Sequence, residues 1–373
     1  MMEMIYIAKD IPLWQVTIWD KKFNNVDKKW QPKTIKYKYL LSDELDSLRV
    51  DDGDVRILYT GKDVGFTTEE LAGDRLSEGE IISIPWGGIP TVKYHKGKFV
   101  TGDNRIATSK DINKLTNKYL YYFMRGNIHE IASYYRGASL KHPCMKDILK
   151  MTISYPSVQE QDKICGQFDV LEQIIEVRKQ ELQLLDDLIK ARFVEMFNLS
   201  DCIYKSLGEC TDFVDYRGHT PELSDEGIIR MVNAKSVGKG FFKYVDEFVT
   251  EETYDAWMHR GFGYPGDILF VTEGHTFGNT CLIPEDMTKF ALGQRVITIK
   301  GKEEIKNAFL CSYMQTDMFW KDINVYRTGG TAQGIRSKDL VKVMVPIPPI
   351  EQQIEFVRFV HKVDKSKVVE IIN

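Results

Sequence analysis

An internal duplication limits the fold of this chain more than any other sequence feature. Three pairs of segments match in the same order along its 373 residues: 136–161 with 328–353, 105–124 with 295–314, and 78–84 with 265–271. The first pair is offset by 192 residues and the second by 190, both without gaps. Because matches in one order indicate a repeated structural unit, the sequence predicts two copies of one fold.

Each copy ends in a proline-containing hinge that leads into a helix. The hinges are YPSVQEQ at 155–161 and IPPIEQQ at 347–353, and proline suits a helix entrance, where its missing N–H is not needed. The stretch 159–198 has one glycine and no proline, which predicts a helix of about 40 residues and roughly 60 Å. The second helix, 351–372, is about half as long.

Apolar residues recur every four and three positions in turn along the first helix, which is the pattern of a coiled coil. We expect the second helix to pack antiparallel against this stripe; the alternative is a long helix that lies on its own domain. Because the second helix is short, either the natural chain is longer or another subunit covers the remainder. The residues expected at the interface are Ile164, Phe168, Leu171, Ile175, Leu182, Leu185 and Ile189, with Ile354, Val357 and Val368.

The predicted fold class is therefore α+β. Two repeated globular domains of mixed sheet and short helices are joined by two long helices that form an antiparallel coiled coil. We expect the first domain at residues 1–156, the long helix at 157–200, the second domain at 201–347 and the short helix at 348–373.

Composition excludes several classes of protein. With 43% hydrophobic and 28% charged residues, the chain is neither disordered nor collagen-like. No stretch approaches the roughly 18 apolar residues of a membrane helix, and the N-terminus lacks the basic region of a secretion signal. We expect a cytoplasmic protein with no membrane partner. The six cysteines form no C-x-x-C pair and are expected to be reduced and packed, with no metal site.

The net charge of −4 conceals two basic stretches. Residues 93–150 carry 12 Lys and Arg against 4 Asp and Glu, and residues 289–342 carry 10 against 5. Because such side chains displace counterions from phosphates, these stretches suit a polyanion such as DNA; ordinary solvated surface is the alternative.

No motif of a catalytic site accompanies these features. The sequence has no G-x-x-x-x-G-K-[ST] loop, no [DN]-P-P-[YFW] amino-methylase motif, and neither H-E-x-x-H nor G-x-S-x-G. We expect a non-enzymatic chain without catalytic residues and without a cofactor of its own.

Both hinge-and-helix segments resemble the conserved regions of Type I restriction–modification specificity (S) subunits. That family has a P-x-x-E-Q helix entrance after each of two target-recognition domains, which PSVQEQ and PIPPIEQQ resemble. GIIRMVNAKSVGKGFF, YPGDILFVTEGHTFGN, GQRVITIK and GGTAQGIRSKDL resemble the framework of the second recognition domain. The first domain departs more, because GASLKHP stands in place of the G-T-A-Q-G-I loop.

The resemblance implies a DNA-recognition subunit of a restriction–methyltransferase complex. Each target-recognition domain would contact one half of a split double-stranded DNA target. The helices would fix the gap and dock two methylation (M) subunits, and restriction (R) subunits would join the full complex. S-adenosylmethionine, ATP and Mg²⁺ would be bound by those partners. Two alternatives stay open: a coiled-coil adapter that binds no DNA, and the specificity module of a fused restriction–methylation enzyme.

Loops in each domain carry the side chains expected to contact DNA. Lys and Arg bind phosphates, whereas Arg, Lys, Asn, Gln and Ser bind base edges. The loops YRGASLKHPCMKD and YRTGGTAQGIRSKD are richest in such groups; structural turns with solvated charges are the alternative. The predicted contacts are Trp86, Lys93, Arg105, Tyr135, Arg136, Ser139, Lys141, His142 and Lys146 in the first domain, and Arg217, His219, Lys235, His275, Arg295, Tyr326, Arg327, Thr331, Gln333, Arg336 and Lys338 in the second.

Overall fold

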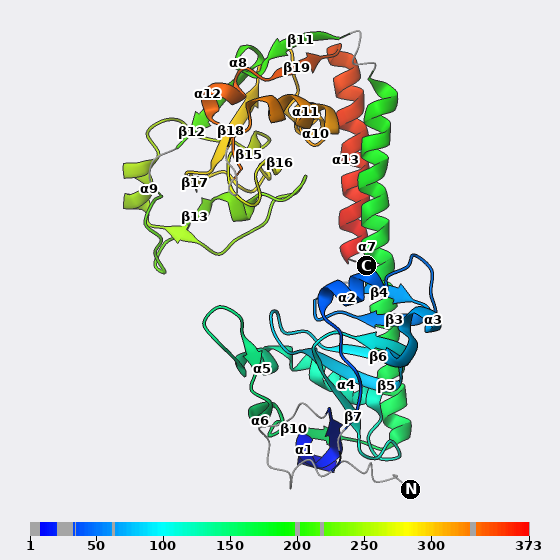
Figure 1. Cartoon of the computed structure of the whole chain (residues 1–373). Coiled ribbons are helices and arrows are strands. Elements are labelled where there is room, and N and C mark those ends of the chain that lie inside the picture. Colours follow the sequence, from blue (N-terminus) through cyan, green and yellow to red (C-terminus); the bar gives the residue numbers. More distant parts are fainter. Residues whose placement is uncertain are drawn as a thin grey trace, which may run out of the picture. The chain divides into compact units, whose positions relative to one another are not determined.

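The structure, a computed structural model, describes residues 8–20, 33, 35–61, 64–197, 202–216, 220–328 and 333–372 (Figure 1). The chain divides into two compact units, Met1–Val177 and Arg178–Asn373. Helix α7, Val158–Met196, contributes residues to both units. Because the division falls inside this helix, the four predicted domain boundaries stay predictions.

The first unit contains a six-stranded mixed sheet. Its strand order is β2-β7-β5-β6-β3-β4, and all neighbours are antiparallel except β3 and β6. Two short ribbons, β1-β10 and β8-β9, complete the strands. The elements before α7 are β1 Ala8–Pro12, α1 Leu13–Val16, β2 Thr17–Trp19, α2 Ser42–Ser47, β3 Val55–Leu58, β4 Val64–Thr67, α3 Glu69–Ala72, η1 Gly73–Arg75, β5 Ser77–Pro85, β6 Lys93–Thr101, β7 Asn104–Ser109, α4 Asn117–Gly126, α5 Ile128–Ser133, β8 Tyr135–Arg136, β9 His142–Pro143, α6 Met145–Ile148 and β10 Thr152–Tyr155.

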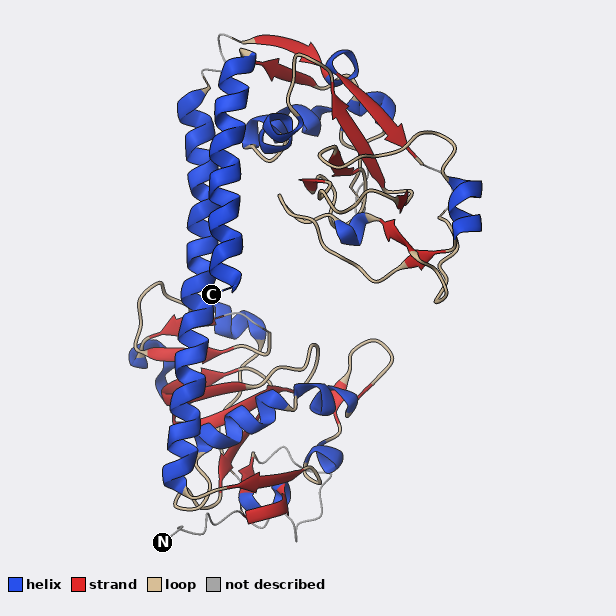
Figure 2. Ribbon diagram, turned by 180° about the vertical axis from the view of Figure 1, so that it is seen from behind, coloured by secondary structure: helices blue, strands red, loops and turns tan. Residues whose placement is uncertain are grey.

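Helix α4 packs on strands β5, β6 and β7 of this sheet and lies beside the first half of α7 (Figure 2). Leu120 and Met124, which are fully buried, face the apolar core that the sheet also lines. On the other side of α4, the hydroxyl of Tyr122 donates to Asp169 of α7 at 2.7 Å, and the Lys118 ammonium pairs with the same carboxylate at 2.5 Å. Polar contacts of α4 therefore attach α7 to the unit.

The second unit contains two smaller sheets. The four-stranded antiparallel sheet has the order β12-β18-β15-β16, and the three-stranded sheet β14-β13-β17 pairs β13 and β17 in parallel. A ribbon of β11 and β19 precedes the second hinge. The elements are β11 Ile203–Ser206, α8 Leu207–Cys210, β12 Thr211–Asp215, β13 Ile229–Val232, η3 Ala234–Ser236, β14 Phe248–Val249, α9 Glu251–Trp257, β15 Ile268–Val271, β16 Thr280–Leu282, β17 Phe290–Leu292, β18 Val296–Gly301, α10 Asn307–Tyr313, α11 Asp317–Tyr326, α12 Ser337–Leu340, β19 Met344–Ile347 and α13 Ile350–Ile372.

Strand β15 is apolar throughout because both of its faces are covered. Ile268 and Phe270 belong to a core shared with α10, α11, α7 and α13. Leu269 and Val271 point into a second core, shared with the three-stranded sheet. A strand buried on both faces reads as a continuous apolar run rather than an alternating one.

The N-terminal segments show that the two units share one fold. The N–H of Leu13 donates to Met151 at 2.8 Å, and the N–H of Leu207 donates to Val343 at 2.9 Å. A threonine after each first helix then donates its hydroxyl to that same leucine's carbonyl, at 2.6 and 2.5 Å. The predicted α+β fold with two repeated globular parts is confirmed.

A buried glutamine in each hinge anchors the long helix that follows. Gln161 makes three hydrogen bonds, to the carbonyls of Lys114 and Pro156 and from the N–H of Thr116, at 2.7, 2.8 and 2.8 Å. Gln353 bonds in the same way to the carbonyls of Glu304 and Pro348 and from the N–H of Lys306, at 3.0, 2.8 and 2.8 Å. Both side chains are fully buried, so one amide fixes hinge and helix in each unit.

The strand register corrects one sequence match. The last residue of β5 pairs with Asn104, and the last residue of β15 pairs with Val296. The partner strands β7 and β18 therefore correspond at an offset of 192 rather than 190. Arg105 is equivalent to Ile297, and its apparent match with Arg295 is displaced by two residues.

The helices that follow these strands correspond at an offset of 190. Asn117 accepts from the N–H of Ser109, and Asn307 accepts from the N–H of Gly301, both at 2.6 Å. The loop between strand and helix is thus two residues shorter in the second unit. An ungapped comparison cannot show this difference.

The first half of α7 buries a different face from the one predicted. It turns Gln161, Cys165 and Asp169 toward the unit, because the polar contacts with α4 set its rotation. The predicted seam residues of this half are half-buried or exposed: Ile164 is half-buried, and Phe168, Leu171 and Ile175 are 43%, 52% and 53% exposed.

The second half of α7 does pair with α13 in antiparallel fashion. Phe356 meets Phe197 at 5.5 Å between ring centroids, and Phe359, further along α13, lies near Arg192, which is earlier in α7. The predicted residues Leu182, Leu185, Ile189, Ile354 and Val357 are half-buried. Among the described side chains of α13, the buried ones are Gln353, Phe356 and Val363, so its seam is shifted by one residue. The side chain of Val368 lies outside the described part.

Replacing Gln161 by alanine should expose the dependence of the first unit on its hinge. Three buried main-chain groups lose their partner, which lowers the free energy of unfolding of that unit by about 2–4 kcal/mol. Hydrogen exchange should accelerate at the N–H of Thr116 and in α4, but not in α10; Gln353→Ala should give the converse. The exposed neighbours Gln159→Ala and Gln352→Ala serve as controls. Wild-type protection in both glutamine variants would contradict this account.

Candidate nucleic-acid interface

In the first unit, the loop after β5 is clamped to the β8-β9 ribbon. Residues 86–92 and 135–146 together form what we call the first corner. Two hydrogen bonds join these segments: from Gly88 N–H to the carbonyl of Lys141 at 3.2 Å, and between Nδ1 of His142 and the carbonyl of Trp86 at 2.7 Å. In addition, the Tyr135 hydroxyl donates at 2.9 Å to the carbonyl of Pro85, which immediately precedes the loop. The loop is therefore held against the ribbon at both its start and its turn.

The second unit repeats this arrangement after β15. Its second corner consists of residues 272–279 together with the described residues of 326–338. Two hydrogen bonds join its segments: from Gly274 N–H to the carbonyl of Gln333 at 3.0 Å and from Ile335 N–H to the carbonyl of Thr272 at 2.9 Å. In both units a loop that leaves a central strand is thus attached to the segment that precedes the last strand.

A glycine with positive φ forms the equivalent clamp in each corner. Gly88 has φ of 92° and Gly274 has φ of 97°. No atom lies within 4 Å of the place where a Cβ would stand at either position. Glycine is therefore required by the backbone conformation and not by crowding.

Basic and polar side chains of the first corner face solvent. Arg136 is 66% exposed and lies 3.7 Å from Asp147, which is a weak, water-screened pair. Ser139, Lys141 and Lys146 are exposed, as predicted for a binding surface. Trp86 and His142 are half-buried beside them, with ring centroids 5.2 Å apart.

The second corner also presents positive charge. Arg327, Arg336, Lys338 and His275 are exposed, whereas Tyr326 and Gln333 are half-buried. Arg295 is 54% exposed and pairs at 3.0 Å with Glu273, which is 57% exposed. Lys235 is 69% exposed and pairs with Glu247. Its segment adjoins the corner, because the Asn279 amide donates to the carbonyl of Val237 at 3.0 Å.

Two predicted DNA contacts are corrected by burial. Arg105 is 1% exposed and Tyr135 is 5% exposed, so neither side chain reaches the surface. Lys93 is half-buried, and its ammonium donates to the carbonyls of Tyr59, at 2.5 Å, and Gly61. Burial also raises the pKa of Tyr135 well above its ordinary value, which fits a structural hydroxyl. Arg217, His219 and Thr331 lie outside the described residues, so their predictions stay open.

Sequence reasoning missed the clamps and the partners of Arg105. The sequences WGG and TEG, directly after matching strands, were the available signal for Gly88 and Gly274. No local signal links Arg105 to Asp20, which precedes it by 85 residues.

Metal ligands and reactive thiols are two kinds of group whose chemistry would go beyond hydrogen bonding and charge. No group of three or more His, Cys, Asp or Glu among them is arranged to hold a metal ion. Burial raises the pKa of Cys165 and Cys210 to about 11, so these thiols are protonated at neutral pH and poor nucleophiles. No helix within the described ranges has the length and apolarity needed to cross a membrane.

A duplicated α+β protein with one hinge and long helix per copy is the class that this fold defines. The Type I restriction modification DNA specificity domain matches the chain twice, over residues 45–186 and 212–373. These matches cover most of the chain, and the chain belongs to this family.

Several known proteins are similar to the chain. The specificity subunit of the Escherichia coli Type I restriction enzyme EcoDI is 21% identical over 309 residues, or 73% of this chain and 68% of that protein. The EcoR124I/EcoR124II specificity subunit of Escherichia coli is 24% identical over 280 residues, or 70% and 66%. The crystal structure of a Type I S subunit from M. genitalium has a TM-score of 0.57 and 16% identity, covering 99% of this chain and 92% of the other. This likeness supports the fold.

Alanine at Gly88 or Gly274 should loosen one corner at a time. A side chain at positive φ costs roughly 1–2 kcal/mol, and because space is free at both positions the cost falls on the backbone alone. We expect faster hydrogen exchange at residues 86–92 in Gly88→Ala, and at residues 272–279 in Gly274→Ala. Gly126→Ala, which is equally open but lacks positive φ, is the control. Unchanged exchange at both loops would refute the clamp.

Proposed function

We propose that the chain is the DNA-recognition (specificity) subunit of a Type I restriction–modification complex. It reads a split double-stranded DNA target, with one corner for each half-site. The observation that carries this proposal is repeated in both units of a protein of the DNA specificity family: a glycine-clamped loop is held against a segment that presents exposed Lys and Arg. Two copies of one surface suit a ligand that offers two sites of one kind.

Each corner has the side chains that DNA recognition requires. Arg136, Lys141 and Lys146 in the first corner supply positive charge for phosphates, as do Arg327 and Arg336 in the second. Half-buried aromatic and amide groups stand behind these charges, at a depth where base edges are read. Glycine at the turn of each loop lets the backbone approach its ligand closely.

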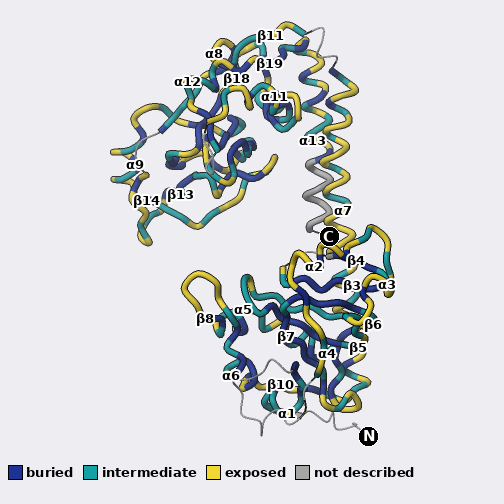
Figure 3. Tube along the Cα trace, in the orientation of Figure 1, coloured by how far each residue is buried: buried dark blue, intermediate teal, exposed yellow. Residues whose placement is uncertain are grey.

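The long helices carry the proposed contacts with methylation subunits, two in number. Much of α7 is exposed (Figure 3). Its exposed residues include the apolar Val170 at 54%, Ile174 at 51%, Leu184 at 67% and Leu188 at 48%. Exposed apolar stripes of this kind mark protein interfaces. Restriction subunits join the full complex. S-adenosylmethionine, ATP and Mg²⁺ bind to those partners in the cytoplasm, and this chain itself catalyses no reaction.

Membership of the DNA specificity family does not favour the alternative, a coiled-coil adapter protein that binds no DNA. An adapter needs no clamped glycine turns with exposed arginine and lysine around them. A specificity module of a fused restriction–methylation enzyme would use the same corners and would differ only in its partners.

Charge reversal in the corners should abolish specific DNA binding. We expect Lys141→Glu with Lys146→Glu, or Arg336→Glu with Lys338→Glu, to weaken binding of the chain assembled with methylation subunits. The salt dependence of binding should fall by about 0.9 in log–log slope for each phosphate that the variant no longer neutralises. Titration of labelled duplex at several salt concentrations measures both quantities.

The matched control reverses two exposed lysines on β6 and β18, the strands next to β5 and β15, at positions away from the corners. Lys96 pairs across from Glu80 near the start of β5, and Lys300 lies near the end of β18 that is remote from the second corner. Lys96→Glu with Lys300→Glu changes net charge equally and should retain binding. Equal losses of DNA binding in the control and corner variants would mean that net charge alone explains the effect. A wild-type complex that binds DNA without sequence preference would reject the proposed function.

Aspartate on the exposed stripe of α7 should impair assembly without unfolding the unit. Val170→Asp with Ile174→Asp places charge where an apolar partner surface would pack, and both positions are about half exposed. Co-purification with methylation subunits should fall at least tenfold, while hydrogen exchange in α4 stays at the wild-type level. Gln183→Asp on the exposed polar surface of the same helix is the control. Undiminished assembly would place the methylation subunits elsewhere.

A further inference from the structure

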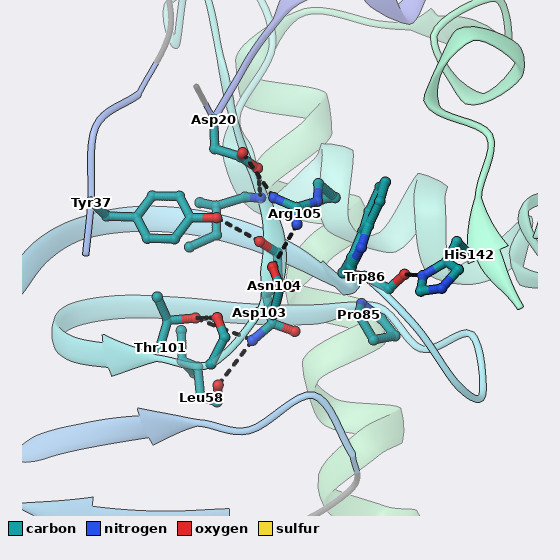
Figure 4. Close-up of polar contacts among 12 residues, drawn as sticks. Asp20, Tyr37, Leu58, Pro85, Trp86, Thr101, Asp103, Asn104, Arg105 and His142 are labelled. Carbon is teal, nitrogen blue, oxygen red and sulfur yellow. Dashed lines mark hydrogen bonds and ion pairs between the residues drawn. The ribbon is translucent and has the colours of Figure 1, made fainter. Parts of the chain in front are cut away.

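A buried arginine lies directly behind the first corner (Figure 4). Arg105 donates to Asp20 at 3.1 Å and to Asp103 at 2.6 Å. Asp20 is itself 1% exposed, and its second oxygen accepts from the N–H of Ile106 at 2.8 Å. Burial and the nearby Asp20 carboxylate raise the pKa of Tyr37 far above its ordinary value, which fits a site shielded from water.

The guanidinium of Arg105 supports the indole ring of Trp86. Its central carbon lies 4.4 Å from the ring centroid, as expected for a cation–π contact. The N–H of Trp86 donates to the carbonyl of Asp103 at 2.9 Å, and the Trp86 carbonyl bonds with His142. Trp86 therefore connects the buried ion pair to both the loop and the ribbon of the first corner.

The fold itself does not require this arginine. The equivalent strand position in the second unit holds Ile297, which is fully buried. A buried ion pair is weak evidence for stability, because an apolar residue of similar size serves as well or better. Moreover, Nε of Arg105 has no hydrogen-bond acceptor in the part of the chain that the structure describes. A buried arginine that the fold does not require therefore suggests a role other than stability.

We propose that Arg105 is a positioning residue for DNA specificity in the first unit: paired with Asp20 and Asp103, it fixes Trp86 and thereby the loop 86–92 for reading one half-site. This inference rests on the proposed function, and it concerns a buried residue that would not itself touch DNA. The planar guanidinium gives the indole a fixed orientation, because two carboxylates prevent its rotation. The second corner has no counterpart at this strand position, since Ile297 cannot bond to a carboxylate.

The test is a comparison of base discrimination at the two half-sites. After the split target is defined by methylome sequencing, the complex with methylation subunits is assayed on duplexes that carry one base change in either half. Trp86→Ala should lower discrimination at one half-site only. The double variant Arg105→Ile with Asp20→Asn reproduces the neutral pattern of the second unit and should lower discrimination about tenfold at that same half-site. The triple variant should lose no more than Trp86→Ala alone, because Arg105 acts through Trp86.

Two further measurements separate positioning from structural damage. Arg105→Lys retains the charge but not the planar contact, and should recover only part of the discrimination. Hydrogen exchange of β7 should stay near wild type in the double variant, because no unpaired charge is left in the core.

Wild-type discrimination in Arg105→Ile with Asp20→Asn would overturn the inference, as would an equal loss at both half-sites accompanied by faster exchange in β7. So would a further loss in the triple variant beyond Trp86→Ala. A wild-type complex without any preference for a split target would instead reject the proposed function, so the two failures are distinguishable.

Discussion

The buried glutamine at the entrance of each long helix is the interaction on which this architecture depends. One side-chain amide satisfies two carbonyls and one N–H that belong to two distant segments of the chain, the turn before α4 and the hinge. Glutamate lacks the donors, and asparagine is one carbon shorter, so few residues can replace it. The same amide also contacts a helix N-cap, Thr116 of α4 in the first unit and Lys306 of α10 in the second. It therefore fixes the start of α7 or α13 relative to that helix.

Around this common anchor the two units have diverged in their sheets and corners. The first builds a single six-stranded sheet, whereas the second divides its strands between two sheets. The glycine clamps are retained in both, at Gly88 and Gly274. The clamp sets the position of each loop while leaving its side chains free to vary, which is the requirement for a scaffold that presents different surfaces on one frame.

The sequence predicts the duplication, the hinges, both long helices and the α+β class, since these depend on local patterns of proline, glycine and apolar residues. It does not predict the rotation of α7, because Lys118 and Tyr122 fix Asp169 through contacts 47 to 51 residues apart. Nor does it predict the burial of Arg105. A difference of two residues between strand and helix is invisible in an ungapped match, so Arg105 was compared with Arg295 rather than with Ile297. A function cannot be assigned to a single side chain when the strand register and the burial of that side chain are unknown.

Arg105 and Arg295 show that burial decides more than residue type whether a side chain is available to a ligand. Arg295 and Glu273 are both more than half exposed, and such a pair contributes about 0–1 kcal/mol because water screens it. Arg295 can therefore leave its partner for another anion at small cost. Arg105 cannot leave Asp20, because separation would place two unpaired charges in the interior at a cost of several kcal/mol. We therefore expect the first corner to be the more rigid of the two, although both belong to repeated copies of one fold.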